Sequence, residues 1–134
     1  MIYCCITKIK PIDTKELDRI LAFASVYLGI EDDVCVNVIF SKTCNADGYA
    51  AWNEDEDVYD IEINSRLSKD DIIRTIFHEV VHVKQIHEKL LEPDDRIWNG
   101  VDCSELNYDE YPWEIDAYVV ENELMEKYLQ TRDT

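Results

Sequence analysis

Hydrophobic residues recur at helical spacing in three segments of the chain. The first segment follows Asp13, a helix N-cap with a hydrophobic staple at Ile12, and ends before Gly29. The second begins with the capping-box-like sequence at residues 68–71 and extends to about Leu91. The third begins at Pro112, a favoured first residue of a helix. Their core-facing positions are Leu17, Ile20, Leu21, Ala24, Tyr27 and Leu28, then Ile72, Ile76, Val80, Val83 and Ile86, then Ala117, Val120, Leu124 and Tyr128. The pattern predicts three helices.

Four further segments have the composition or the alternation of β-strands, at residues 2–9, 34–41, 49–52 and 58–64. The acidic run at residues 53–57 separates the last two and predicts a hairpin turn. The alternative is a calcium loop, but the run lacks the spaced ligands and the glycine of that motif. The order of helices and strands indicates an α+β fold.

The length of 134 residues predicts one domain, spanning residues 1–134. With 46% hydrophobic residues and only 3 glycines and 3 prolines, the chain can form one packed core. Residues 92–110 have no periodicity and read as a long irregular connection. This segment is a lid, part of a substrate cleft, or a solvated loop held in place by its two aromatic residues, Trp98 and Tyr108.

The formal net charge is −17, which repels phosphate backbones and anionic lipid headgroups. We therefore expect no nucleic-acid or membrane partner, and either a preference for cationic partners or simply an acidic solvated surface. Five cysteines without a C-x-x-C pair favour reduced, buried thiols over disulfides or a thiolate zinc site: Cys4, Cys5, Cys35, Cys44 and Cys103. No apolar stretch approaches the ~18 residues of a membrane span. The chain is expected to be cytoplasmic.

The second predicted helix contains an H-E-x-x-H motif at residues 78–82. Histidines four residues apart lie on one helical face, so His78 and His82 can bind one Zn²⁺. Glu79 is rotated by about 100° and can reach a water on that metal without being a ligand. The alternative is that both histidines only pack in a helix, but the apolar surroundings favour an active-site helix.

Zinc needs a third protein ligand, and the remaining histidine does not supply it. His87 lies about 140° around the helix from His82 and opposite His78, so we expect a surface or supporting position for it. The later histidine and the glycine of the metzincin spacing are also absent. The third ligand must therefore be a carboxylate from another segment.

The last predicted helix offers several carboxylates. Glu114, Ala117, Tyr118 and Glu121 share one helical face, while Asp116 points elsewhere. Composition alone does not choose among the 30 carboxylates of the chain, and position helps more, because the connection before this helix is long enough to bring it back across the active-site helix. The alternative explanation for Glu114 is a first-turn acid that interacts favourably with the helix dipole.

H-E-x-x-H followed by a glutamate on a second helix resembles the gluzincin arrangement. The chain looks like the minigluzincins and the small phage or bacterial metallopeptidases that carry a P-W-E-x-[ED]-A segment. The resemblance covers about residues 46–121. The matching pieces are Ala50-Ala51-Trp52, HEVVHVKQ at 78–85, Trp98-Asn99-Gly100 and YPWEIDAY at 111–118.

This resemblance implies a small zincin-like domain. Its twisted, mainly antiparallel sheet of three to five strands would pack on the active-site helix, and an N-terminal and a C-terminal helix would complete the α+β domain. The outer strand, here residues 48–52, would lie over the metal and pair with an extended peptide, so Ala50, Ala51 and Trp52 are the expected substrate-binding residues.

The resemblance also implies one Zn²⁺ per chain, held by His78, His82 and Glu114. Asp116 is the alternative third ligand, followed by Glu121. Many relatives have an aspartate or asparagine that orients a zinc histidine at the position occupied here by Tyr118, so we expect this metal site to be weaker or differently supported.

No residue clearly matches the group that stabilises the oxyanion in relatives. Tyr108, Tyr111 and His87 are the candidates.

The expected function is a zinc-dependent peptidase in which Glu79 acts as general base on a metal-activated water. Its substrates would be peptides or proteins, with a preference for basic residues. The alternative is a non-catalytic, metal-binding interaction domain that docks a partner peptide on its edge strand. A SprT-like protease acting on DNA-bound proteins is disfavoured, because its usual third ligand is a histidine and this chain is strongly acidic.

Overall fold

A four-stranded sheet forms one side of the molecule. The computed structural model describes residues 2–8 and 11–132, without the side chains of residues 3–8. The sheet contains β1 (Ile2–Lys8), β2 (Val34–Ser41), β3 (Gly48–Asn53) and β4 (Val58–Asn64) in the order β1-β2-β4-β3. Strand β3 therefore lies at an edge, as expected for the outer strand. The predicted α+β class is confirmed.

The directions of the strands differ from the prediction. In this sheet β1 pairs with β2 and β2 pairs with β4 in parallel, and β3 pairs with β4 in antiparallel orientation. The expectation of a mainly antiparallel sheet was wrong here because α1 connects β1 to β2 as a crossover. The predicted hairpin between β3 and β4 is present, with β3 at the outer edge of the sheet and β4 paired with β2.

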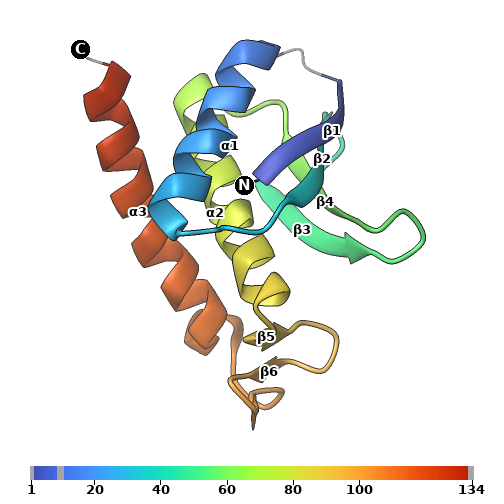
Figure 1. Ribbon diagram of the computed structural model, residues 1–134. Helices are drawn as coiled ribbons and strands as arrows, with labels where there is room; N and C mark the ends of the chain where they lie inside the picture. The colour runs from blue at the N-terminus through green and yellow to red at the C-terminus, as the bar shows by residue number, and fades with distance from the viewer. Residues whose placement is uncertain (1, 9–10, 133–134) are drawn as a thin grey trace.

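The helices are α1 (Thr14–Leu28), α2 (Lys69–His87) and α3 (Pro112–Arg132). Asp13 and Ser68 cap α1 and α2, accepting hydrogen bonds from the backbone N–H groups of Glu16 and Asp71. Gly29 ends α1 in the left-handed conformation at φ 68°. Helix α2 ends at His87, about one turn earlier than predicted. Figure 1 shows α1 and α2 between the sheet and α3.

The hydrophobic core lies between the sheet and the helices. Helix α2 is buried along most of its length because it contacts both the sheet and α3. The fully buried side chains include Val36, Val38, Ile61 and Ile63 from the sheet and Ile73, Ile76, Phe77, Val80 and Val83 from α2. This packing fixes the rotation of α2, and with it the side on which His78 and His82 lie.

The segment predicted as an irregular connection contains short regular elements. Strands β5 (Leu91–Glu92), β6 (Ile97–Trp98) and β7 (Val101–Asp102) form a small antiparallel sheet, and a 3₁₀ turn follows at Tyr108–Glu110. Leu91, Cys103 and Trp113 form a second, smaller buried cluster. The segment therefore packs at the end of α2 and leads directly into α3.

The cysteines only partly follow the prediction of reduced thiols. Cys44 and Cys103 are free and buried. Cys35 is disulfide-bonded, which contradicts that prediction. The side chains of Cys4 and Cys5 lie outside the described residues. No helix in the described part of the chain is both long and apolar enough to cross a membrane.

Candidate metal centre

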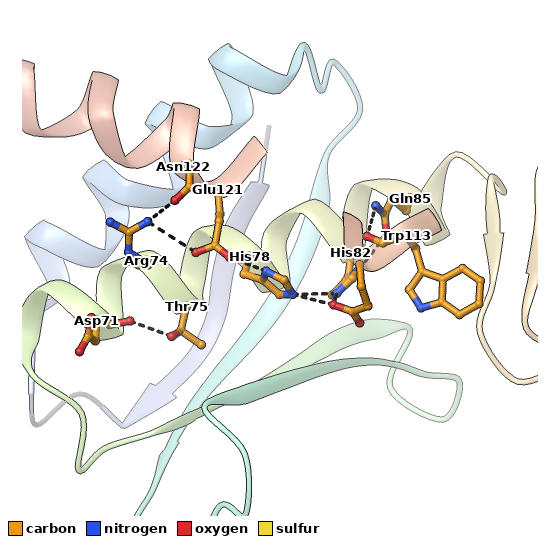
Figure 2. Close-up of polar contacts among 10 residues, drawn as sticks. Asp71, Arg74, Thr75, His78, His82, Gln85, Trp113, Glu121 and Asn122 are labelled. Atoms are coloured by element: carbon orange, nitrogen blue, oxygen red, sulfur yellow. Dashed lines mark hydrogen bonds and ion pairs between the residues drawn. The ribbon is translucent and has the colours of Figure 1, made fainter. Parts of the chain in front are cut away.

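Helix α2 places two imidazole rings next to each other. His78 and His82 are four residues apart on one helical face, and their Nε2 atoms lie 3.2 Å from each other. Both residues are buried, with only 8% of each exposed. Figure 2 shows the two rings in line along α2, as the motif predicts.

The first turn of α3 supplies a carboxylate to the same point. Glu114 Oε1 lies 2.9 Å from His78 Nε2 and 3.2 Å from His82 Nε2. Three potential ligand atoms from two helices therefore converge, and this group could hold a metal ion. Among the candidate third ligands, Glu114 is the one that joins the two histidines in this group.

Glu121 and Asp116 are not part of this group and instead form hydrogen bonds around it. His78 Nδ1 donates to Glu121 Oε1 at 2.8 Å, which leaves Nε2 directed toward Glu114. On the other side, His82 Nδ1 donates to Gln85 Oε1 at 2.8 Å. The amide of Gln85 in turn donates to Asp116 Oδ2 at 2.9 Å. Each histidine is thus oriented through its outer nitrogen, as is usual for metal-binding histidines.

The support of His78 differs from the pattern expected in relatives, in keeping with the tyrosine at position 118. Tyr118, at the position expected to hold an orienting carboxylate or amide, packs its ring against His78 with centroids 4.7 Å apart. Glu121, one helical turn further along α3, takes over the hydrogen bond to His78. The role of Gln85 was not predicted, although its position three residues after His82 was a usable signal.

The charges of the cluster are strongly coupled. Burial lowers the pKa of His78, but hydrogen bonds with Glu114 and Glu121 outweigh it and bring this pKa to about 10. Burial raises the pKa of Glu114, but the hydrogen bonds from His78 and His82 dominate and lower it to about 2. Glu114 is therefore a carboxylate at neutral pH, which is the form that binds cations.

Glu79 has the properties of a proton acceptor. Only 5% of the residue is exposed, and its carboxylate forms no hydrogen bond or ion pair with another described residue. Burial raises its pKa to about 7, against the lowering effect of His82 and His78. A carboxyl group with a pKa near neutrality can both take up and release a proton.

Two pockets meet at Glu79 and His78. One, of about 380 Å³, extends beside the N-terminal half of α2, and the other, of about 300 Å³, extends toward its C-terminal end. Both are bordered by Ala46 in the segment before β3, by Gly48 at the start of β3 and by Tyr108. The candidate metal centre is thus reachable from both sides.

Strand β3 approaches α2 closely at Gly48. A Cβ atom there would lie 2.8 Å from the Glu62 carbonyl oxygen and 2.8 Å from Thr75 Cγ2. Of the three expected substrate-binding residues, Ala50 lines the 300 Å³ pocket. Ala51 alternates to the other face of the sheet. Trp52 packs on Tyr59 and is not among the described residues that line either pocket.

The three oxyanion candidates lie in different places. Tyr108 borders both pockets, and burial, the charge of Glu114 and a hydrogen bond with Tyr118 raise the pKa of its hydroxyl. Tyr111 stacks on Trp113 at 4.4 Å between centroids. His87 pairs with Asp32 at 3.2 Å and borders a separate pocket. Among these candidates, only Tyr108 is brought to the cluster.

The arrangement can hold a cation with three side chains, orient both histidines and place a buried carboxylate beside them. Comparison with known proteins adds no further assignment. No protein-family model matches this chain, and no curated protein and no solved structure shows significant similarity to it.

Proposed function

We propose that the protein is a zinc-dependent peptidase of the gluzincin type. The observation that carries this proposal is the convergence of His78, His82 and Glu114 beside the unpartnered carboxylate of Glu79. In a tetrahedral zinc site with bonds of roughly 2.0 to 2.1 Å, ligand atoms are roughly 3.3 Å apart. The distances here, 2.9 Å and twice 3.2 Å, fit that geometry.

Each group of the site has a separate role in the proposed reaction. Zinc, held by His78, His82 and Glu114, would act as a Lewis acid that lowers the pKa of water and polarises a carbonyl. Glu79 accepts the proton of the attacking water and later donates it to the leaving amine. Tyr108 is the hydroxyl positioned to donate a hydrogen bond to the carbonyl oxygen as it gains negative charge.

The free edge of β3 favours an extended peptide as substrate. Strand β3 pairs with β4 on one side, and its start borders both pockets of the cluster. A peptide added to this edge would form main-chain hydrogen bonds and carry its backbone past the metal centre. This supports an endopeptidase-like mode, in which side chains on both sides of the cleaved bond contact the protein.

Metal content and peptide hydrolysis of a Glu79→Gln variant test this proposal. We expect about one zinc per chain by mass spectrometry in both proteins, and a loss of kcat of at least about 100-fold in the variant. Glu88→Gln is the matched control, because Glu88 is an exposed residue at the end of α2 that pairs with Lys84. An unchanged kcat in Glu79→Gln would refute the proposed role of Glu79.

A second candidate function is peptide binding without hydrolysis. The exposed side chains of Tyr49 and Trp52, 51% and 43% exposed, favour it because aromatic residues on a free edge strand suit peptide docking. In that case the protein would bind peptides with equal affinity in the wild type and in Glu79→Gln, and neither form would cleave them.

A further inference from the structure

The two pockets beside the metal centre differ in chemistry. The polar pocket contains Asp47, Asp71, Arg74, Thr75 and Glu121 in addition to His78 and Glu79. The apolar pocket contains Ala50, Ile86, Leu91, Pro93 and Trp113 in addition to His82 and Glu114. Because Glu79 and His78 belong to both, a peptide crossing the metal centre would place neighbouring side chains in different pockets.

The arginine that lines the polar pocket is already engaged. Arg74 Nη1 donates to Asn122 Oδ1 at 2.5 Å and lies 3.9 Å from Glu121 Oε2 (Figure 2). These contacts direct the guanidinium toward α3. Arg74 therefore neutralises part of the charge of Glu121, and it forms no ion pair with Asp47 or Asp71 among the described residues.

Asp47 and Asp71 leave the polar pocket with excess negative charge. Both residues are exposed, and neither carboxylate forms an ion pair within the described part of the chain. They come from different elements, the segment before β3 and the first turn of α2. The pocket thus offers two solvent-facing carboxylates, a lining that favours a cationic group over an anionic one.

Glu79 adds a buried carboxylate to the lining of the polar pocket. Only 5% of this residue is exposed, and it lines the pocket. Its carboxylate has no hydrogen-bond or ion-pair partner among the described residues. A buried carboxylate without a partner is costly unless a ligand or solvent approaches it. The pocket is therefore continuous with the reacting end of the site.

We propose that the polar pocket binds a lysine or arginine side chain of the substrate, while the apolar pocket binds an aliphatic or aromatic side chain across the cleaved bond. This inference rests on the proposed peptidase function. It assigns the preference for basic substrates to Asp47 and Asp71, in contrast to a preference that arises only from the net charge of −17.

Peptides that differ at one residue separate these two sources of preference. The substrates are short fluorogenic peptides containing Leu-Lys or Lys-Leu, with norleucine or glutamate replacing lysine in matched sets. We expect the kcat/KM of the zinc-loaded enzyme to be about tenfold higher for the lysine peptides than for the norleucine peptides. Two partly exposed ion pairs, one to each aspartate, would together provide a difference of this size. The Asp47→Asn/Asp71→Asn double variant should lose most of this ratio.

The matched control is Asp55→Asn/Glu56→Gln. This control also removes two negative charges, but from the turn between β3 and β4, and neither of its residues lines the two pockets. We expect the lysine preference to remain in this control. An equal loss in both double variants would overturn the inference and leave the overall charge as the cause. A preference for glutamate peptides that disappears in Arg74→Gln would overturn it in favour of a carboxylate site.

Binding measurements distinguish a failed inference from a failed function. Fluorescence anisotropy of the labelled lysine and norleucine peptides on Glu79→Gln protein reports the pocket without catalysis. Tighter binding of lysine peptides that is lost in Asp47→Asn/Asp71→Asn supports the pocket assignment even if no peptide is cleaved. Cleavage or binding without any lysine preference refutes the assignment and leaves the peptidase proposal intact.

Discussion

Replacing Glu121 by alanine should weaken metal binding although Glu121 is not one of the three converging ligands. Its carboxylate accepts a hydrogen bond of 2.8 Å from His78 Nδ1, and the residue is 5% exposed. Without this acceptor, the His78 ring would lose the contact that fixes its rotation and that holds the Nδ1 proton when a metal displaces the proton on Nε2. The Nε2 lone pair is then less often available to the metal.

The expected magnitude follows from two independent considerations. Loss of an outer partner of a metal-binding histidine typically weakens affinity by about 10- to 100-fold, which is about 1.4 to 2.8 kcal/mol. A hydrogen bond to a charged group contributes about 1.5 to 3 kcal/mol by itself. The two ranges overlap, so we expect the zinc Kd of Glu121→Ala to rise by about 10- to 100-fold.

Competition with a fluorescent zinc chelator measures this Kd directly. Glu121→Gln is the conservative variant, because its amide oxygen can still accept from His78, and its Kd should lie closer to the wild type. Glu126→Ala removes an exposed acid from the same helix and serves as the matched control. A Kd for Glu121→Ala within twofold of that control would refute the reasoning that Glu121 orients His78.

Three further results are expected. Zinc at 100 times its Kd should stabilise the wild type by about 2.7 kcal/mol in thermal unfolding, and Glu114→Ala should lose most of this gain. Gly48→Ala should lower the free energy of unfolding in urea by about 1 to 3 kcal/mol, because the new Cβ would lie 2.8 Å from the Glu62 carbonyl oxygen and from Thr75 Cγ2. An unchanged urea midpoint would show that β3 can shift to make room for the methyl group. Asp13→Ala should cost about 1 kcal/mol in the same urea titration through loss of the α1 cap, whereas Asp13→Asn should retain most of it.

The helices were predictable because their signals are local. Capping residues such as Asp13 and Ser68 and a repeat of 3.6 residues are readable without knowledge of the fold. Strand direction is not local, because it depends on which strands become neighbours. Strand β4 lies next to β2 only because β3 folds to the outside. Strands β5 to β7 have two residues each, too few to show an alternating pattern.

The candidate site also has features that the local sequence predicts and features that depend on how the helices pack. One turn of helix fixes the relation of His78 to His82, so the motif alone indicated that pair. Glu114 was suggested by family resemblance, since many carboxylates of the chain were equally compatible with its composition. The support of His78 by Glu121 depends on how α3 packs against α2. No spacing within a single helix contains that information.

Gln85 connects the candidate metal centre to the packing of α2 against α3. Its side chain accepts from His82 and donates to the Trp113 carbonyl at 3.1 Å and to Asp116. Trp113 and Asp116 flank Glu114 on the first turn of α3, so the same amide that orients one histidine also holds the helix that carries the carboxylate. Trp113 is in turn buried against Leu91 and Cys103 of the connecting segment. The segment between α2 and α3 therefore packs against the turn of α3 that carries Glu114, and it contributes to the structural support of the candidate metal centre.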